Sequence, residues 1–490
     1  MSAVRKSFLL SMLDSYLGVA LQLASTVIVS RLLTPSEVGV FAIAAVFSSL
    51  ASTFRDFGVA EYMIQERELN DRRIRAALAM NIIVSWLMAA LLAVIGPLAG
   101  SFYEDAGVRN VMWVLALNFV FVPFGAVTMA WFRRELNYKP IVIANALSSV
   151  MAFIVAVGLA HAGWGYMSLA WSSLAGIIVS VLAAAWFRPA GFPSSPSLAG
   201  LSEVFNFGKF ATGIYIFARL GKGAPELIIG KSGGPADVGI FSRANGLVEI
   251  FNRLVLRSVM QVCLPYFARS DRESGALTPA YLRSTTLVTA VGWPFLAVMA
   301  VLAFPAVRLI YGAQWLEAVA LAQILCLAMA IELIHAMSRE ALLARGDARR
   351  ANALQMQIVA MQVLGLTAAI PYGLQGACWG LVAAAGAGAA LSQWHLKRAI
   401  GLKLGGMMAA CRSSLWLSVA TAVPLAVVSV WLPPDESNFV IWATAASIVA
   451  SSVWVAGLFA QKHPLWIDLT EVAERLIRRW RGSGPTSGSM

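Results

Sequence analysis

The seven residues PSEVGVF at positions 35–41 recur as PADVGIF at positions 235–241, an offset of 200 residues. Each copy lies in the turn between the first two apolar segments of a block of six. Because six is an even number, two such blocks enter a membrane with the same orientation, as in transporters whose halves are related by an axis along the membrane normal. The repeat therefore predicts two pseudo-symmetric lobes of six helices each.

The composition places the chain in a membrane. Of its 490 residues, 59% are hydrophobic and 13% are charged, and the mean hydropathy is +0.73. A soluble domain carries about 25% charged residues, and a membrane span takes about 20 apolar residues. The apolar residues suffice for about fourteen spans. This excludes a soluble enzyme, a secreted disulfide scaffold and a nucleic-acid-binding protein.

We therefore predict an all-α polytopic membrane protein with fourteen transmembrane helices. The lobes surround a central cavity and occupy residues 1–200 and 201–395, two extra helices lie within 396–460, and a cytoplasmic amphipathic tail covers 461–490. The predicted spans are 8–33, 38–60, 77–95, 111–130, 141–160, 166–187, 207–228, 238–260, 286–304, 317–336, 353–371, 376–394, 413–432 and 439–460.

The basic residues indicate how the chain is oriented. Of the 37 lysines and arginines, 27 lie in the loops on the side of the N-terminus, and four lie in the opposite loops. Loops rich in lysine and arginine remain in the cytoplasm. We expect a bacterial inner-membrane protein with both termini in the cytoplasm. The net charge of +12 then reflects topology and not binding to nucleic acid.

The C-terminal tail has the pattern of an amphipathic helix on the inner leaflet. Its apolar residues fall on one helical stripe, with arginines among and after them. The stripe consists of Leu465, Leu469, Val472, Leu476 and Trp480.

Eleven charged residues fall inside the predicted spans, where a charge at mid-span costs about 2.5–3.5 kcal/mol on insertion scales. Such residues usually face a cavity or a partner. The basic residues are Arg55, Arg219, Lys222, Arg243, Arg253 and Arg257. The acidic residues are Asp14, Asp56, Glu226, Glu249 and Glu332.

Two neighbouring spans carry charged stripes. Arg219, Lys222 and Glu226 are spaced three and four residues apart, and Glu249, Arg253 and Arg257 are four apart. Residues at these spacings share one face of a helix, so the two stripes can face a common cationic cavity. In the alternative interpretation, Arg253, Arg257 and Arg243 extend to the nearest membrane surface.

Asp14 and Glu332 remain without an obvious local base. Glu332 precedes His335 by three residues. Either carboxylate could carry a coupling proton, because burial moves such a group toward a neutral pKa. A structural hydrogen bond between helices is the alternative for both.

The motifs of an enzyme are missing from the sequence. Gly230-Lys231-Ser232 lacks the glycine that begins a phosphate-binding loop, since Pro225 occupies that position. The four histidines have no metal-ligand spacing. The outer turns are too short for the acidic outer loop of a membrane glycan transferase. We expect neither a metal nor a cofactor.

The N-terminal motifs resemble those of bacterial polysaccharide transporters. Residues 31–41 (RLLTPSEVGVF), 54–60 (FRDFGVA) and Ile64-Gln65 are similar to the start of the O-antigen and exopolysaccharide flippases in the multidrug/oligosaccharidyl-lipid/polysaccharide exporter superfamily. The resemblance implies alternating access and an undecaprenyl-diphosphate-linked oligosaccharide as cargo, moved to the periplasmic leaflet by a proton or sodium gradient. It also implies contact with membrane lipid and with the glycan polymerase and chain-length proteins of the same pathway. Only Arg55 and Asp56 transfer to this chain by position.

The surplus of arginine fits this cargo independently. A diphosphate that enters a cavity of low dielectric needs cations, and arginine binds phosphate oxygens in a bidentate manner. Three alternatives stay open at this point: a lipid II flippase, a cationic-drug antiporter of the same superfamily, and, from another class, a membrane glycan polymerase or ligase.

The charge distribution yields a topology prediction. A reporter fused after residue 460 should be active only if it works in the cytoplasm, and one inserted at residue 435 only if it works in the periplasm. Reporter activity in whole cells measures this, and the opposite pattern would contradict the predicted set of spans.

Overall fold

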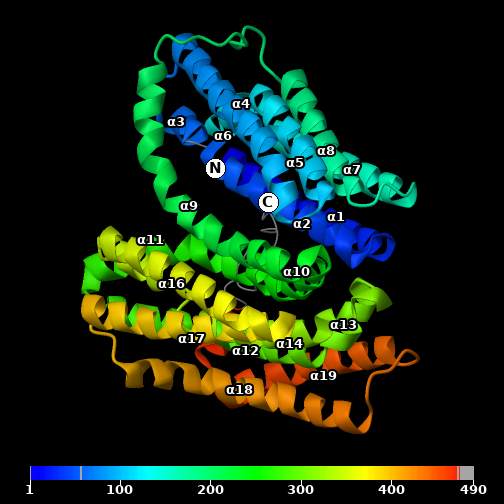
Figure 1. The fold of residues 1–490 in the computed structure, drawn as a ribbon. Helices are drawn as coiled ribbons and strands as arrows, with labels where there is room; N and C mark the ends of the chain where they lie inside the picture. Colours follow the sequence, from blue (N-terminus) through cyan, green and yellow to red (C-terminus); the bar gives the residue numbers. More distant parts are fainter. Residues whose placement is uncertain (1, 56–57, 472–473, 475–490) are drawn as a thin grey trace, which may run out of the picture. The chain divides into compact units, whose positions relative to one another are not determined.

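In the computed structural model, the chain is built of helices joined by short turns (Figure 1). The structure describes residues 2–55, 58–471 and 474; the side chains of residues 2–15 and 207–218 are outside this description. Within the described residues there is no strand. The predicted all-α class is confirmed.

The chain divides into two compact units, which are described separately. The first comprises Met1–Arg243, Ile310–Ala318 and Leu366–Ala377, and the second comprises Ala244–Leu309, Val319–Gly365 and Cys378–Met490. The helices of the first unit are α1 (Ser2–Leu32), α2 (Pro35–Arg55), α3 (Val59–Gln65), α4 (Asp71–Phe102), α5 (Ala106–Phe121), α6 (Pro123–Arg134), α7 (Tyr138–His161), α8 (Met167–Trp186), α9 (Leu201–Ser232) and the start of α10 (Gly234–Phe251), with the short 3₁₀ turns η2 (Ala313–Trp315) and η3 (Ile370–Tyr372).

The second unit continues α10 into a π-helical turn. Its elements are η1 (Asn252–Leu256), α11 (Arg257–Ser274), α12 (Leu277–Val301), α13 (Ala303–Ile310), α14 (Ala318–Leu333), α15 (Ser338–Ala344), α16 (Ala348–Ala369), α17 (Gly373–Ile400), α18 (Leu404–Trp431) and α19 (Phe439–Ala460).

The first copy of the repeat begins α2 with a capping box. The Glu37 carboxylate accepts hydrogen bonds from the backbone N–H of Thr34 at 2.8 Å and from its hydroxyl at 2.9 Å. The Thr34 hydroxyl accepts in turn from the Glu37 N–H at 3.3 Å. Pro35 stands at the first helical position, where its missing N–H costs nothing. The sequence TPSE thus fixes the residue at which the helix starts.

The two copies of the repeat pack against each other through their glycines. A Cβ atom at Gly39 would overlap the carbonyl oxygen of Pro235, and a Cβ atom at Gly239 would overlap that of Pro35. Only glycine lets the two backbones approach this closely. The start of α2 and the start of α10 therefore form a reciprocal contact, which we call the glycine seal.

The segment 310–318 closes the end of α1 beside this seal. The Gln314 amide donates to the carbonyls of Ser30 at 2.6 Å and Leu33 at 2.8 Å, and the Trp315 indole donates to Ser30 at 2.8 Å. Carbonyls in the last turn of a helix have no partner within the helix. Gln314 and Trp315 supply those partners, so this later segment belongs to the first unit.

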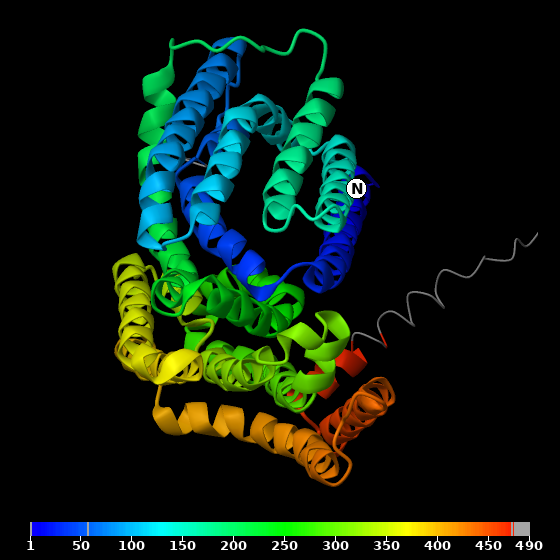
Figure 2. The ribbon, with the colours of Figure 1, turned by 45° about the vertical axis from the view of Figure 1, so that its right-hand side comes forward.

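A core formed by α3, α4 and α6 lies beyond the C-terminal end of α2, away from the glycine seal. Buried residues from the three helices include Met63, Ala77 and Val127, with Val204 of α9 added. Pro123 begins α6, and its axis bends by 52° from that of α5. Segment 187–200 then runs from α8 to α9 across these ends (Figure 2), where the Ser197 N–H donates to the Arg75 carbonyl at 3.2 Å.

The second unit is held together by polar contacts between apolar helices. Across the interface of α12 and α18, the Thr289 hydroxyl donates to Ser414 at 2.9 Å and the Thr286 hydroxyl to the Ala410 carbonyl at 3.0 Å. In the helical hairpin of α16 and α17, Gly365 packs on the backbone carbonyl of Gly380. Small and hydroxylated residues are the usual contacts between membrane helices.

The described helices account for nine candidate membrane spans by length and composition, or ten if the bent pair α5–α6 is one span. One of the nine covers Ala348–Ile400 and so contains both helices of the hairpin. Within the described residues, each predicted span is largely helical, but the spans 38–60, 111–130, 238–260 and 286–304 each run from one helix into the next. The number fourteen itself stays a prediction, as do the proposed lobe boundaries.

The start of the tail packs on the protein. Residues 464–471 are helical, and Leu465 and Trp466 pack with Leu417 and Leu458. Arg283 forms an ion pair with Asp468 at 2.6 Å. Val472, Leu476 and Trp480 of the predicted stripe lie outside the described residues.

The glycine seal gives a stability prediction. Gly39→Ala and Gly239→Ala should each destabilise the protein by about 1–3 kcal/mol, because the added methyl forces two backbones apart. Gly158→Ala in α7 is the matched control, since a Cβ there meets no atom within 4 Å. Thermal unfolding in detergent measures the effect. Equal melting temperatures for all three variants would show that the seal can open without cost.

Candidate functional site

A polar cavity of about 370 Å³ lies within the first unit, at the helix ends opposite the glycine seal. Residues from α2, α3, α4, α6, α7 and α8 line it. Its charged lining residues are Arg55, Glu61 and Arg133, and its neutral polar lining residues are Asn81, Asn145 and Ser180.

Arg55 reaches the cavity because α2 stops there. It is the last residue of α2, and Gly58 takes a left-handed conformation with φ of 68° before α3 begins. Glycine adopts this conformation at little cost. The Arg55 side chain is half-buried, and its guanidinium lies 5.8 Å from the ring centre of Phe119. An aromatic face stabilises a cation in a setting with little water.

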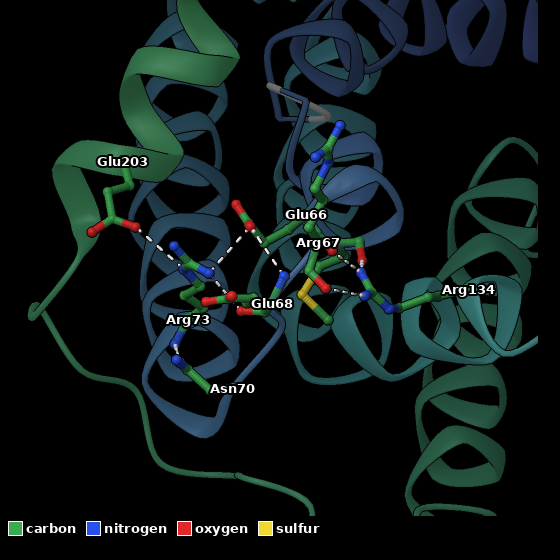
Figure 3. A network of polar contacts seen from close by, with 8 residues as sticks. Glu66, Arg67, Glu68, Asn70, Arg73, Arg134 and Glu203 are labelled. Atoms are coloured by element: carbon green, nitrogen blue, oxygen red, sulfur yellow. Dashed lines mark hydrogen bonds and ion pairs between the residues drawn. The ribbon is translucent and has the colours of Figure 1, made fainter.

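Arg133 and Arg134 are neighbours on α6 with different surroundings. The Arg133 guanidinium is exposed to the cavity and makes no hydrogen bond or ion pair with any described residue. The Arg134 guanidinium donates to the carbonyls of Met63 at 2.9 Å and Arg67 at 3.4 Å, and also to that of Glu66 (Figure 3). One arginine is thus available to a ligand, and the next one holds the chain after α3.

The network around Arg73 holds the same loop from the other side. Arg73 forms ion pairs with Glu66 at 3.1 Å and with Glu203 of α9 at 3.4 Å, and its guanidinium also donates to the Glu68 carbonyl (Figure 3). The Asn70 side chain accepts from the Arg73 N–H at 3.0 Å and caps α4. These contacts fix α3, and hence Glu61, relative to α4 and α6.

The neutral polar residues come from three separate helices. Asn81 on α4 is 4% exposed, and Ser85 donates to its side-chain oxygen at 3.4 Å. Asn145 on α7 and Ser180 on α8 line the same space. Amide and hydroxyl groups can donate and accept at once, so this lining suits a ligand rich in hydroxyl groups.

The predicted stripe on α9 is helical. Arg219 and Lys222 are exposed, and Glu226 is half-buried. They belong to the first unit, whereas Glu249, Arg253 and Arg257 belong to the second. That the two stripes face a common space stays a prediction.

The second stripe falls on the π-helical turn. The Glu249 carboxylate accepts from the Asn252 amide at 3.1 Å. Arg253 lies inside η1 and Arg257 begins α11, both with exposed side chains. π-helical turns are rare and occur frequently at functional sites. The sequence spacing alone gave no sign of this irregularity.

Arg243 has an aromatic environment. Its guanidinium lies 5.2 Å from the ring centre of Trp315 and 5.5 Å from that of Tyr311. Both rings belong to the segment that closes α1. Arg243 therefore joins this segment to the start of α10, and its predicted place on the cargo path is untested.

The predicted acidic partners are described in part. The side chain of Asp14 and the whole of Asp56 lie outside the described residues. Glu332 lies in the last turn of α14. The ring of His335 meets the Tyr281 hydroxyl at 3.2 Å, and that hydroxyl meets Ser338 at 3.2 Å. The coupling role of these acids remains a prediction.

Of the six polar lining residues among those that the structure describes, the sequence predicted one, Arg55. Arg133 was counted among the loop residues because it follows an apolar span. Asn81, Asn145 and Ser180 lie inside predicted spans, and polar residues there are a signal for a cavity. They come from α4, α7 and α8, so their convergence depends on how these helices pack, which the residue spacing along each helix does not give.

The chain belongs to a family described as polysaccharide biosynthesis proteins, whose model matches residues 28–320. The resemblance inferred from the N-terminal motifs is thereby confirmed. The teichuronic acid biosynthesis protein TuaB of Bacillus subtilis (strain 168) is 21% identical over 87% of each chain. The succinoglycan biosynthesis transport protein ExoT of Rhizobium meliloti (strain 1021) is 26% identical over 60% of each chain.

Among solved structures, the lipid II flippase MurJ in an inward closed conformation matches with a TM-score of 0.73 and 12% identity. The match covers 93% of this chain and 99% of that one. At this identity the likeness establishes the fold alone. The chain has the fold of the multidrug/oligosaccharidyl-lipid/polysaccharide exporter superfamily.

The different surroundings of Arg133 and Arg134 give a prediction that separates a structural role from a ligand-binding role. Arg134→Ala should speed backbone hydrogen exchange in residues 59–70, because it removes several charged hydrogen bonds worth about 1.5–3 kcal/mol each. Exchange followed by mass spectrometry measures this. Arg133→Ala is the control and should leave exchange there unchanged. Faster exchange in both variants would contradict the division of roles.

Proposed function

We propose that this member of the polysaccharide biosynthesis protein family moves undecaprenyl-diphosphate-linked oligosaccharide units from the cytoplasmic to the periplasmic leaflet for surface polysaccharide synthesis. It is a transporter and not an enzyme. The observation that carries the proposal is the polar cavity among the helices of the first unit, with Arg55 and Arg133 in its lining.

The charge of the cavity supports an anionic cargo. Each guanidinium placed among membrane helices costs free energy on insertion, and an anionic ligand offsets that cost. Arginine binds phosphate and carboxylate oxygens with two parallel hydrogen bonds. A cavity for cationic drugs would instead need an excess of carboxylates, whereas this lining has two arginines and one glutamate.

The names of the relatives support a polysaccharide precursor. TuaB is named for teichuronic acid biosynthesis and ExoT for succinoglycan transport. We infer that this chain handles a comparable lipid-linked unit. Lipid II carries the same diphosphate head group, so transport of lipid II is the alternative that the experiment must separate.

The mechanism we infer is alternating access driven by a cation gradient. The cargo would enter near Arg55, and its diphosphate would pass to the cations Arg219, Lys222, Arg243, Arg253 and Arg257. The acids Asp14, Asp56, Glu226, Glu249 and Glu332 would balance these charges or carry the coupling ion. A site of low dielectric strengthens each of these interactions.

Arg219 offers a direct test. In a strain that depends on this protein for surface polysaccharide, Arg219→Ala should lower export about tenfold or more, because one charge-assisted contact to the cargo is lost. Arg219→Lys should restore part of the export, and Arg219→Glu should be worse than alanine because it repels phosphate. Surface polysaccharide per cell, normalised to protein in the membrane, measures the effect.

The control is Arg272→Ala, an exposed arginine near the end of α11 without a hydrogen bond or ion pair to described residues. It should export normally. Normal export by both Arg219→Ala and Arg219→Glu would remove Arg219 from the cargo path. Rescue of cells that lack their lipid II flippase, without any surface polysaccharide, would favour the alternative cargo.

A further inference from the structure

The cavity in the first unit has a charge balance that points to a more specific ligand. Its lining contains two guanidinium groups, Arg55 and Arg133, and one carboxylate, Glu61. Among the described residues, the formal charge of the lining is therefore +1. A diphosphate with two or more negative charges would exceed this balance and would meet the Glu61 carboxylate as a like charge.

The neutral part of the lining suits a sugar. Asn81, Asn145 and Ser180 present amide and hydroxyl groups from three helices, and a carboxylate such as Glu61 accepts hydrogen bonds from hydroxyl groups. Between them lie apolar side chains, among them Val127 and Ile177. A pyranose ring has the matching surface, with hydroxyl groups at its edge and C–H groups on its faces.

Arg133 is placed to bind a negatively charged group on such a sugar. Its guanidinium is exposed to the cavity and makes no hydrogen bond or ion pair with a described residue. A ligand therefore does not have to displace a partner. Its neighbour Arg134 and the Arg73 network hold the surrounding backbone in place. A planar guanidinium on a fixed backbone is suited to a carboxylate.

We infer that this cavity is a glycan subsite that selects an acidic sugar residue of the cargo, with Arg133 binding the sugar carboxylate and Asn81, Asn145, Ser180 and Glu61 binding hydroxyl groups. The inference rests on the proposed function, because it assigns this cavity to the glycan part of the same cargo. The diphosphate is then left to cations outside the cavity.

The test uses the full-length protein in proteoliposomes with two synthetic cargoes. Both are polyprenyl-diphosphate-linked disaccharides, one ending in glucuronate and the other in glucose, and the measured quantity is the rate at which each becomes accessible to an impermeant glycosidase. The wild-type protein should move the acidic cargo about tenfold faster than the neutral one, the worth of one charge-assisted contact. Arg133→Gln should abolish most of this ratio, and Arg133→Lys should retain part of it.

Arg272→Gln is the matched control and should keep the wild-type ratio. The melting temperature of Arg133→Gln should equal that of the wild type, since no described contact is lost. An equal loss of both rates in Arg133→Gln would overturn the inference and assign Arg133 to the diphosphate. A wild-type protein without preference would also overturn it, while leaving the transport proposal intact. A wild-type protein that moves neither cargo would overturn both.

Discussion

The first unit depends on one backbone contact, the glycine seal, in which Gly39 packs on the carbonyl of Pro235 and Gly239 on that of Pro35. Other contacts lie near the same helix ends, such as the hydrogen bond from the Tyr103 hydroxyl to the Leu227 carbonyl at 3.2 Å. Arg55 lies sixteen residues beyond Gly39 on α2, or about 24 Å at the rise of an α-helix. One helix therefore closes the unit at one end and lines its cavity at the other.

The surroundings of the arginine side chains differ between these two ends of the first unit. Near the seal, the Arg243 guanidinium lies against the rings of Trp315 and Tyr311, which stabilise its charge. In the cavity, the Arg55 guanidinium lies 5.8 Å from the ring centre of Phe119, and the Arg133 guanidinium has no ion pair with a described residue. An arginine enclosed by aromatic rings joins structural elements, whereas one that faces an open polar space can bind an anion. The environment, more than the residue type, separates the two roles.

The sequence predicted the all-α class from composition and the family from local motifs, and both are confirmed. The predicted spans are largely helical within the described residues. The repeat at 35–41 and 235–241 marks two helix starts that contact each other through their glycines, a contact that the repeat did not predict. The cavity could be predicted only at Arg55, because its other polar members come from five other helices, α3, α4, α6, α7 and α8, whose packing is not encoded in local spacing. The π-helical turn at Asn252–Leu256 is another feature without a local signature. Helical spacing identified the charged stripes but could not give the space that each one faces.

The pair Arg133 and Arg134 shows how one helix end can serve both stability and recognition. Successive residues on an α-helix point about 100° apart, so two adjacent arginines at the end of α6 face different surroundings. Arg134 donates to three backbone carbonyls, that of Met63 in the last turn of α3 and those of Glu66 and Arg67 just after it, and this fixes the wall that carries Glu61. The Arg133 guanidinium makes no hydrogen bond or ion pair with a described residue. A change at position 133 can alter the charge of the cavity without loosening its wall. The ligand preference of this cavity can therefore diverge between relatives that keep the same fold.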